Sequence, residues 1–204
     1  IVAGDFYWLV ETDDYIFVAA ADCTGQGVPG AMVSVTCSNA LNKSVLEEKI
    51  TNTNEIVIKQ LQSQQQGQLQ DGMDICLVRI AKNNPKQIQY SGANRSLVMV
   101  KDGILEEYKP DKQPIGYYTY AQPFSVQDID LTKDACLYLF SDGYADQFGG
   151  DKNKKLGTRK WKEILVEISG KNMKEQAEFL KNYFEKWKAS YPQTDDVTVI
   201  GIKC

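Results

Sequence analysis

Short runs of apolar residues, separated by residues that favour turns, follow one another along most of this chain. The runs are rich in Val, Ile, Phe and Tyr, which is typical of β-strands. They predict strands at residues 15–21, 74–80, 87–91, 96–101, 104–108, 124–131, 135–140 and 197–203. Between two of them, Asp102-Gly103 predicts a tight hairpin because a type I′ turn needs positive φ at both central residues.

Three stretches show the spacing of an amphipathic helix instead. The first begins at Pro29 and extends to about residue 48, with an apolar residue at every fourth position: Val33, Cys37, Leu41 and Val45. The second begins near Thr158, a candidate N-cap, and the third begins with the capping-box pair Asn172 and Glu175. We interpret the apolar and aromatic residues of these helices as core packing.

The order of these elements indicates the fold class. Many strands come first and are interrupted by one early helix, and two late helices precede a final strand. The glutamine-rich stretch 60–72 predicts only a helix end and a loop. Such an order predicts an α+β fold with a mostly antiparallel sheet.

Size and composition fit one globular domain spanning residues 1–204. The chain has 43% hydrophobic and 25% charged residues, as ordinary globular proteins do. Its net charge of −4 argues against nucleic acid or an anionic membrane as the main partner. It has no apolar run of about 18 residues or more, so we expect no membrane span. It begins with Ile inside a strand-like run, which indicates a segment of a longer protein.

The cysteine and histidine content excludes several kinds of active site. The five cysteines are odd in number and mostly lie in apolar runs, as reduced core thiols of a cytoplasmic protein do. No cysteine is followed by Arg six positions later, and neither a C-x-x-C pair nor a P-loop is present. Without any histidine, the chain can form neither a His-based zinc site nor a Ser-His-Asp triad.

Acidic residues next to strand-like runs are the main candidates for function. Asp5 and Asp22 follow the runs 1–4 and 15–21, Asp142 closes the run 135–141, and Asp195 and Asp196 precede the last strand. A carboxylate at the rim of a buried strand is costly to desolvate unless a positive charge neutralises it. Carboxylates without His or paired Cys suit Mg²⁺, Mn²⁺ or Ca²⁺.

The segment 20–31, AADCTGQGVPGA, carries most of this information. It brings Asp22 to the rim, and its three glycines allow a tight turn before a helix whose N-terminus favours a phosphate. Taken alone, the segment is equally consistent with a plain strand–turn–helix connection in which the aspartate caps the helix.

Taken in order, the motifs GDFYW, DCTGQGVPGA, DGMD, GAN, PIG, SDGYAD and DDVT resemble the SpoIIE/RsbU-type branch of the PP2C (PPM) metal-dependent serine/threonine phosphatases. The resemblance extends from Gly4 to the last strand. It implies a PP2C-like sandwich of two mainly antiparallel β-sheets flanked by helices, with two Mn²⁺ or Mg²⁺ ions at one edge.

The same resemblance implies roles for individual residues. Asp5 and Asp22 would hold metal, with Asp22 bridging both ions and the carbonyl of Cys23 as a backbone ligand, and Asp142 and Asp195 would complete the site. Asp74 and Asp196 receive no firm role. The chain departs from the family at Gln26, where a histidine is common, and this leaves any histidine-assisted protonation of the leaving group open.

The implied reaction is hydrolysis of phosphoserine or phosphothreonine on a partner protein, typically an anti-sigma-factor antagonist with a STAS domain. The resemblance also implies an upstream sensor domain and allows a homodimer. A catalytically weak or inactive signalling module that binds a partner is the main alternative, and Gln26 is its support. A structural Ca²⁺ module is disfavoured because the chain has no D-x-D-x-D-G loop.

Overall fold

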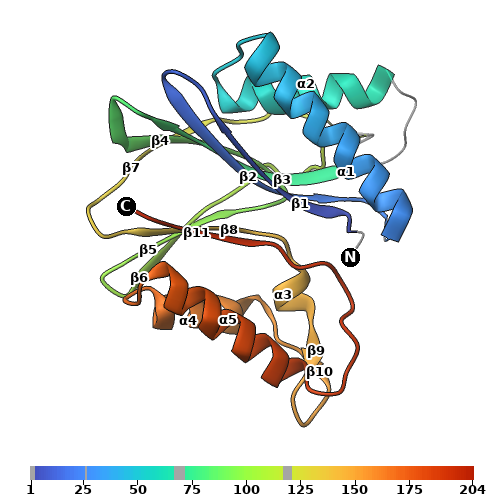
Figure 1. Cartoon of the computed structure of the whole chain (residues 1–204), viewed down its shortest axis with the longest axis vertical. Coiled ribbons are helices and arrows are strands. Elements are labelled where there is room, and N and C mark those ends of the chain that lie inside the picture. Colours follow the sequence, from blue (N-terminus) through green and yellow to red (C-terminus); the bar gives the residue numbers. More distant parts are fainter. Residues whose placement is uncertain (1–2, 26, 67–71, 117–120) are drawn as a thin grey trace.

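The strands pair into two antiparallel sheets that lie face to face, and helices cover both outer faces (Figure 1). The structure is a computed structural model that describes residues 3–25, 27–66, 72–116 and 121–204. From top to bottom in Figure 1 the layers are helices, the first sheet, the second sheet and helices. The predicted α+β class and the sandwich architecture are therefore confirmed.

The first sheet has the strand order β1-β2-β3-β4-β7. Its strands are β1 (Asp5–Glu11), β2 (Tyr15–Cys23), β3 (Met73–Ala81), β4 (Asn84–Ala93) and β7 (Gln127–Asp130). The central strands β2 and β3 are apolar on both faces because each face lies against a core. In β2, for example, Phe17 and Ala19 face the helices whereas Val18 and Ala20 face the second sheet.

The second sheet has the order β11-β8-β5-β6. It consists of β11 (Val199–Lys203), β8 (Cys136–Phe140), β5 (Leu97–Lys101) and β6 (Ile104–Tyr108). The hairpin between β5 and β6 turns at Asp102 and Gly103, both with positive φ, as predicted. A separate two-stranded ribbon pairs β9 (Phe148–Gly149) with β10 (Lys154–Lys155).

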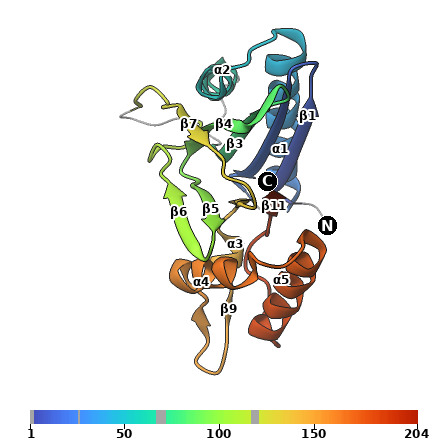
Figure 2. The ribbon, with the colours of Figure 1, turned by 90° about the vertical axis from the view of Figure 1, so that its left-hand side faces the viewer.

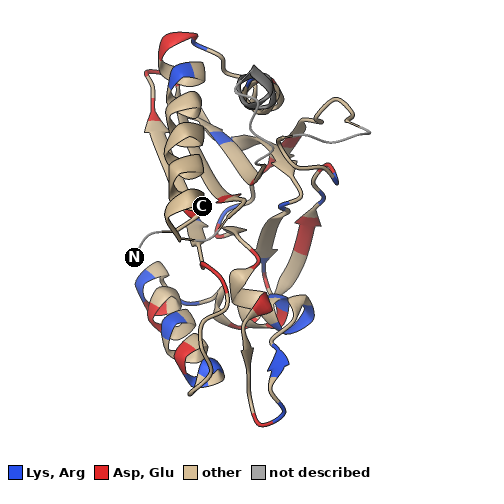
Figure 3. Cartoon of the chain, turned by 90° about the vertical axis from the view of Figure 1, so that its right-hand side faces the viewer, with Lys and Arg blue, Asp and Glu red and all other residues tan. Residues whose placement is uncertain are grey.

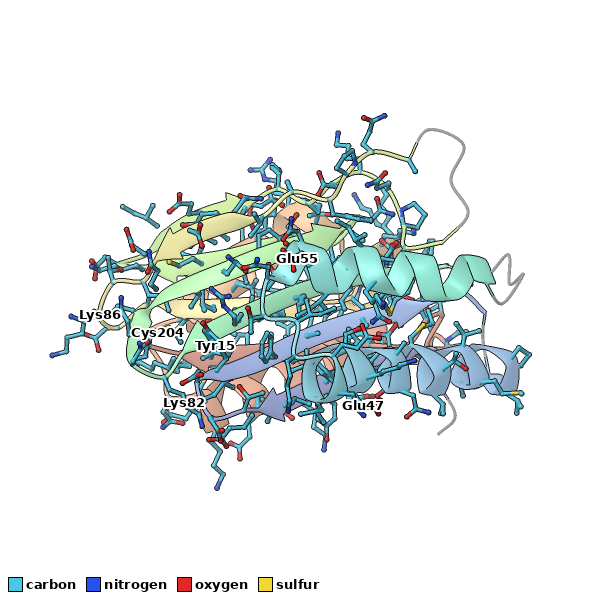
Figure 4. The ribbon with its side chains drawn as sticks, turned by 90° about the horizontal axis from the view of Figure 1, so that it is seen from above. Tyr15, Glu47, Glu55, Lys82, Lys86 and Cys204 are labelled. Carbon is cyan, nitrogen blue, oxygen red and sulfur yellow. The ribbon has the colours of Figure 1, made fainter. Side chains whose placement is uncertain are left out.

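Two helical layers complete the sandwich. Helices α1 (Gly27–Asn42) and α2 (Thr53–Gln66), with a π-helical turn η1 (Lys43–Glu47) after α1, lie side by side on the first sheet (Figure 4). Helices α4 (Thr158–Ile168) and α5 (Met173–Lys188) cover the second sheet (Figure 2). A single-turn helix, α3 (Gly143–Asp146), follows β8.

The charged residues distinguish the two helical layers. Helices α4 and α5 carry both basic residues (Lys and Arg) and glutamates on their outer faces, whereas α1 has no charged residue (Figure 3). Toward the core, α4 contributes Trp161, Ile164, Leu165 and Ile168, all fully buried, and Phe184 of α5 joins them. The predicted core role of these side chains is confirmed.

Several predicted boundaries differ from the structure. Asp5 begins β1 and does not end a strand, because the alternation of inward Phe6, Trp8 and Val10 starts only after it. Thr158 is the first residue of α4, whose N-cap is Gly157. Helix α1 begins at Gly27, two residues before Pro29.

Most of helix α2 was not predicted, although its end was. Polar residues on its buried face hide the helical period: Thr53 is fully buried and its backbone N–H donates to Gln89 Oε1 at 2.9 Å. By contrast, the capping box of α5 is confirmed, since Asn172 and Glu175 exchange hydrogen bonds between side chain and backbone. Ala177 of α5, an apolar residue expected in the core, is exposed. The neighbouring Gln176 is buried instead, and it accepts a hydrogen bond from the Tyr138 hydroxyl at 2.8 Å.

Candidate functional site

Strand register brings three aspartates together at one end of the first sheet. Asp5 of β1 lies opposite Asp22 of β2, and Asp22 lies opposite Asp74 of β3. Tyr15, the first residue of β2, marks the other end of the sheet in Figure 4. The three carboxylates therefore lie at the same end of the sheet, because β1, β2 and β3 are adjacent antiparallel strands whose ends coincide.

The second sheet adds its own acidic residues at the same place. Asp142 lies two residues after the end of β8 and is the N-cap residue of α3, and its side chain is 42% exposed. Ser141 joins the two sheets, because its hydroxyl donates to Asp5 Oδ2 at 2.5 Å and accepts from the backbone N–H of Thr198 at 3.0 Å. The backbone N–H of Gly4 donates to Asp196 Oδ2 at 2.8 Å.

Arg95 lies between these carboxylates. Its Nη2 is 2.5 Å from Asp22 Oδ2 and 3.1 Å from Asp74 Oδ2, and its Nη1 is 2.8 Å from Asp142 Oδ2. The guanidinium thus connects acidic residues of both sheets. Its side chain is only 15% exposed, so bulk solvent screens these ion pairs weakly.

Asn94 next to it also contacts the cluster, since its Nδ2 donates to Asp74 Oδ1 at 2.8 Å. Arg95, Asn94 and Ser141 were not singled out from the sequence. The motif GAN at 92–94 was noticed, but only as part of a pattern. A lone arginine after a strand has no spacing that predicts its partners, because those partners come from strands far away in the chain.

Burial and mutual repulsion raise the pKa of several carboxyls in the cluster. Burial raises the pKa of Asp22 to about 7, and Asp5, Asp142 and Asp74 add to the rise, whereas Arg95 opposes it. Burial is also the largest cause of the raised pKa values of Asp5, Asp74 and Asp195. Burial disfavours the charged guanidinium, but Asp142, Asp74 and Asp22 outweigh it and raise the pKa of Arg95.

Tight glycine packing sets the path of the chain beside the acidic residues. A Cβ on Gly30 would lie 2.1 Å from the carbonyl oxygen of Gly25, and one on Gly4 would lie 2.7 Å from that of Cys23. The Cys23 carbonyl, proposed as a backbone ligand, therefore lies against Gly4 close to Asp5. The Cys23 thiol is buried, and its hydrogen bond with Cys37 and its burial raise its pKa, so it stays protonated.

The donor set fits hard divalent cations. Oxygen ligands from carboxylates and one backbone carbonyl are what Mg²⁺ and Mn²⁺ prefer, and one guanidinium does not balance the acidic residues gathered here. Among the described residues, however, no three acidic or cysteine side chains are arranged to hold a metal ion as they stand. Arg95 lies between three of the carboxylates, those of Asp22, Asp74 and Asp142. Gln26 lies outside the described residues.

The matching family model describes Stage II sporulation protein E (SpoIIE) and covers residues 12–204. The chain belongs to the SpoIIE family. Asp5 precedes the matched SpoIIE range, whereas Asp22, Asp142 and Asp195 lie within it. No curated protein matches the chain.

Solved structures carry the same fold as this SpoIIE-family chain. The SiaA-PP2C domain of Pseudomonas aeruginosa has a TM-score of 0.91 at 27% identity, over 100% of this chain and 80% of that one. A structure of the PP2C phosphatase domain and a fragment of the regulatory domain of SpoIIE from Bacillus subtilis has a TM-score of 0.78 at 18% identity, over 100% of this chain and 57% of that one. RsbX in complex with magnesium has a TM-score of 0.70 at 15% identity, over 100% of this chain and 89% of that one. The chain is therefore a PP2C-type phosphatase domain of the SpoIIE class.

Proposed function

We propose that this domain hydrolyses phosphoserine or phosphothreonine on a partner protein with the help of two Mn²⁺ or Mg²⁺ ions. The observation that carries the proposal is the convergence of Asp5, Asp22 and Asp74 with Asp142 at one edge of the sandwich. Clustered carboxylates repel one another and are a burden to the fold unless cations bind them. Membership of the SpoIIE family supports the same activity.

Asp5, Asp22, Asp142, Asp195 and the carbonyl of Cys23 would hold the ions, with Asp22 shared between them. When bound, such ions supply an activated water and offset charge on the phosphoryl oxygens. The protein's own part is to fix the ligands. Ser141 orients Asp5 through its 2.5 Å hydrogen bond, and Asn94 orients Asp74 in the same way. The reaction needs no covalent phospho-enzyme, which agrees with the inert thiol of Cys23.

The proposal includes the protein substrate, an upstream sensor domain and the cellular compartment. We expect the substrate to be a phosphorylated signalling protein such as a STAS-type anti-sigma-factor antagonist, met in the cytoplasm. An upstream sensor domain and a homodimer would suit such a role, and the B. subtilis neighbour has a regulatory domain beside its phosphatase domain. No helix in the described part of the chain is long and apolar enough to cross a membrane.

Hydrolysis of p-nitrophenyl phosphate and of a phosphoserine peptide, with Mn²⁺ and then with EDTA, tests the proposal. We expect turnover with Mn²⁺ or Mg²⁺ that falls to background with EDTA and returns when excess metal is added. Turnover that persists in EDTA would contradict the metal assignment, and no turnover with either ion on any phosphoprotein would contradict the activity.

A partner-binding module without catalysis is the second candidate. The observation in its favour is Arg95, whose guanidinium forms ion pairs with Asp22, Asp74 and Asp142. The two candidates differ in metal binding: a phosphatase must take up Mn²⁺ at these acidic residues, whereas a purely structural cluster need not.

A further inference from the structure

The three ion pairs of Arg95 use carboxylate oxygens that metal binding would also require. Its guanidinium contacts Oδ2 of Asp22, Asp74 and Asp142 at 2.5, 3.1 and 2.8 Å. Asp22 and Asp142 are among the residues proposed as ligands, and Asp22 is the proposed bridge. A guanidinium and a divalent cation cannot occupy the same space between these oxygens, and like charges at such short range repel strongly.

The backbone holds Arg95 firmly at this position. The Tyr90 hydroxyl donates to the carbonyl of Arg95 at 2.7 Å, and Asn94 adopts a positive φ of 56° just before it. The Asp111 N–H donates to the carbonyl of Gly92 at 3.0 Å, and a Cβ at Gly92 would lie 2.5 Å from the carbonyl oxygen of Arg95. The loop is therefore fixed, and any movement of the guanidinium must come from side-chain rotation.

The guanidinium is also incompletely satisfied. Its Nε is buried and has no hydrogen-bond partner among the described residues. A buried N–H without a partner has a cost in free energy, so the inward orientation is maintained by the carboxylates and would lose its advantage once they bind another cation.

We infer that Arg95 is an internal counter-ion of the metal-free site, which holds Asp22, Asp74 and Asp142 together and must rotate away when divalent cations bind. Arg95 is thus a positioning residue that sets the metal affinity of the domain. The inference rests on the proposed metal binding, and it adds that the Arg95 side chain competes with the metal ions for the carboxylates. It accounts for a cluster with the right donors in which no three acidic side chains of the described residues are arranged to hold a metal.

The variant Arg95→Gln tests this by metal binding, which does not depend on turnover. Mn²⁺ affinity is measured by titration calorimetry on protein stripped of metal. If the site with Arg95 rotated away is populated at about 1–10%, removing the competitor should tighten Mn²⁺ binding by about 10- to 100-fold. The metal-free variant should melt at a lower temperature than the wild type, because three carboxylates lose their counter-charge, and Mn²⁺ should raise its melting temperature by more.

Arg79→Gln is the matched control. Arg79 also lies in the first sheet, at the far end of β3, where its Nη1 donates to the carbonyl of Thr51 at 3.0 Å and its guanidinium packs on the Tyr15 ring. The substitution removes the same charge, so it should leave the Mn²⁺ affinity unchanged. Arg95→Lys keeps the positive charge and serves as a second variant that should fold. One ammonium group cannot contact three carboxylates at once, so the Mn²⁺ affinity of Arg95→Lys should lie between those of the wild type and Arg95→Gln.

The outcomes separate the inference from the proposed function. Tighter binding in Arg95→Gln, with no change in Arg79→Gln, supports the counter-ion. Equal or weaker binding in Arg95→Gln while the wild type binds Mn²⁺ overturns the counter-ion alone. No binding by either protein overturns the metal site and the inference with it.

Discussion

At the scale of single residues, Asp22 occupies the middle position among the three aspartates of the first sheet. It lies between Asp5 and Asp74 in the sheet register, it pairs with Arg95, and burial raises its pKa to about 7. A carboxylate kept in so unfavourable a place serves the site at the expense of the fold. Removal of the Asp22 carboxylate should therefore lower the activity without lowering the stability of the fold.

Asp22→Ala should abolish metal-dependent turnover and leave the fold intact, since it removes the proposed shared ligand and also relieves repulsion among the acidic residues. The rate with saturating Mn²⁺ and the circular dichroism spectrum test both parts. Asp130→Ala, an exposed acid on β7 of the same sheet, is the control and should keep the wild-type rate. A variant that retains more than about a tenth of the rate, about 1.4 kcal/mol of barrier, would show that Asp22 is not the bridging ligand.

At the scale of elements, the start of α3 positions the acidic loop before β11. A Cβ on Gly143 would lie only 1.9 Å from the carbonyl oxygen of Asp196. The loop with Asp195 and Asp196 therefore packs directly on the helix that begins after Asp142. Asp-Gly pairs are common in simple turns, but here the glycine is needed for this close approach.

Gly143→Ala should destabilise the domain by about 1–3 kcal/mol through overpacking and should displace the Asp195–Asp196 loop. The measurements are the free energy of unfolding in urea and the affinity for Mn²⁺, and both should decrease. Gly170→Ala is a suitable control, because none of the described residues lies within 4 Å of its added Cβ. If both variants unfold at the same urea concentration, the close packing of α3 on this loop is not important for the fold.

At the scale of the whole molecule, the cluster exists only because the two sheets close on each other. Asp5 comes from the first sheet and Ser141 from the end of a strand of the second, and their 2.5 Å hydrogen bond crosses between them. Folding thus concentrates negative charge, and the free energy of unfolding must depend on pH and on metal.

Stability of the metal-free protein should fall as pH rises from about 4 to about 7. Asp22 has a pKa of about 7 when folded, against an ordinary 3.8, so within this range the folded protein holds a proton that the unfolded chain has released. The loss is at most about 1.4 kcal/mol per pH unit for each proton held. Asp5, Asp74 and Asp195 act in the same direction.

Urea unfolding in EDTA between about pH 5 and about pH 8 measures this dependence. Because the carboxylates must lose their protons to bind a cation, Mn²⁺ affinity should rise over the same range and then level off. A free energy of unfolding that stays constant or increases from pH 5 to 7 would mean that the carboxyls of the cluster titrate normally. Asp22→Ala should reduce the slope, which identifies this carboxyl as a source of it.

The apolar pattern of the chain was enough to predict the fold class and most elements, because apolar periodicity reflects which face of a strand or helix is buried. It also placed Asp22 and Asp142 beside strand ends, where a carboxylate is conspicuous. Helix α2 was largely missed because its buried face is polar at Thr53, and Asp5 was assigned to the wrong end of its strand.

The contacts between distant residues at the site could not be predicted in this way. Arg95 is about seventy positions from Asp22 and about fifty from Asp142, and no local pattern relates them. The same holds for Ser141 with Asp5, and for Gly4 with Asp196, which are separated by 136 and 192 positions. Local sequence dictates local backbone geometry, whereas ion pairs between strand ends depend on sheet order and register, which emerge only when the two sheets pack together.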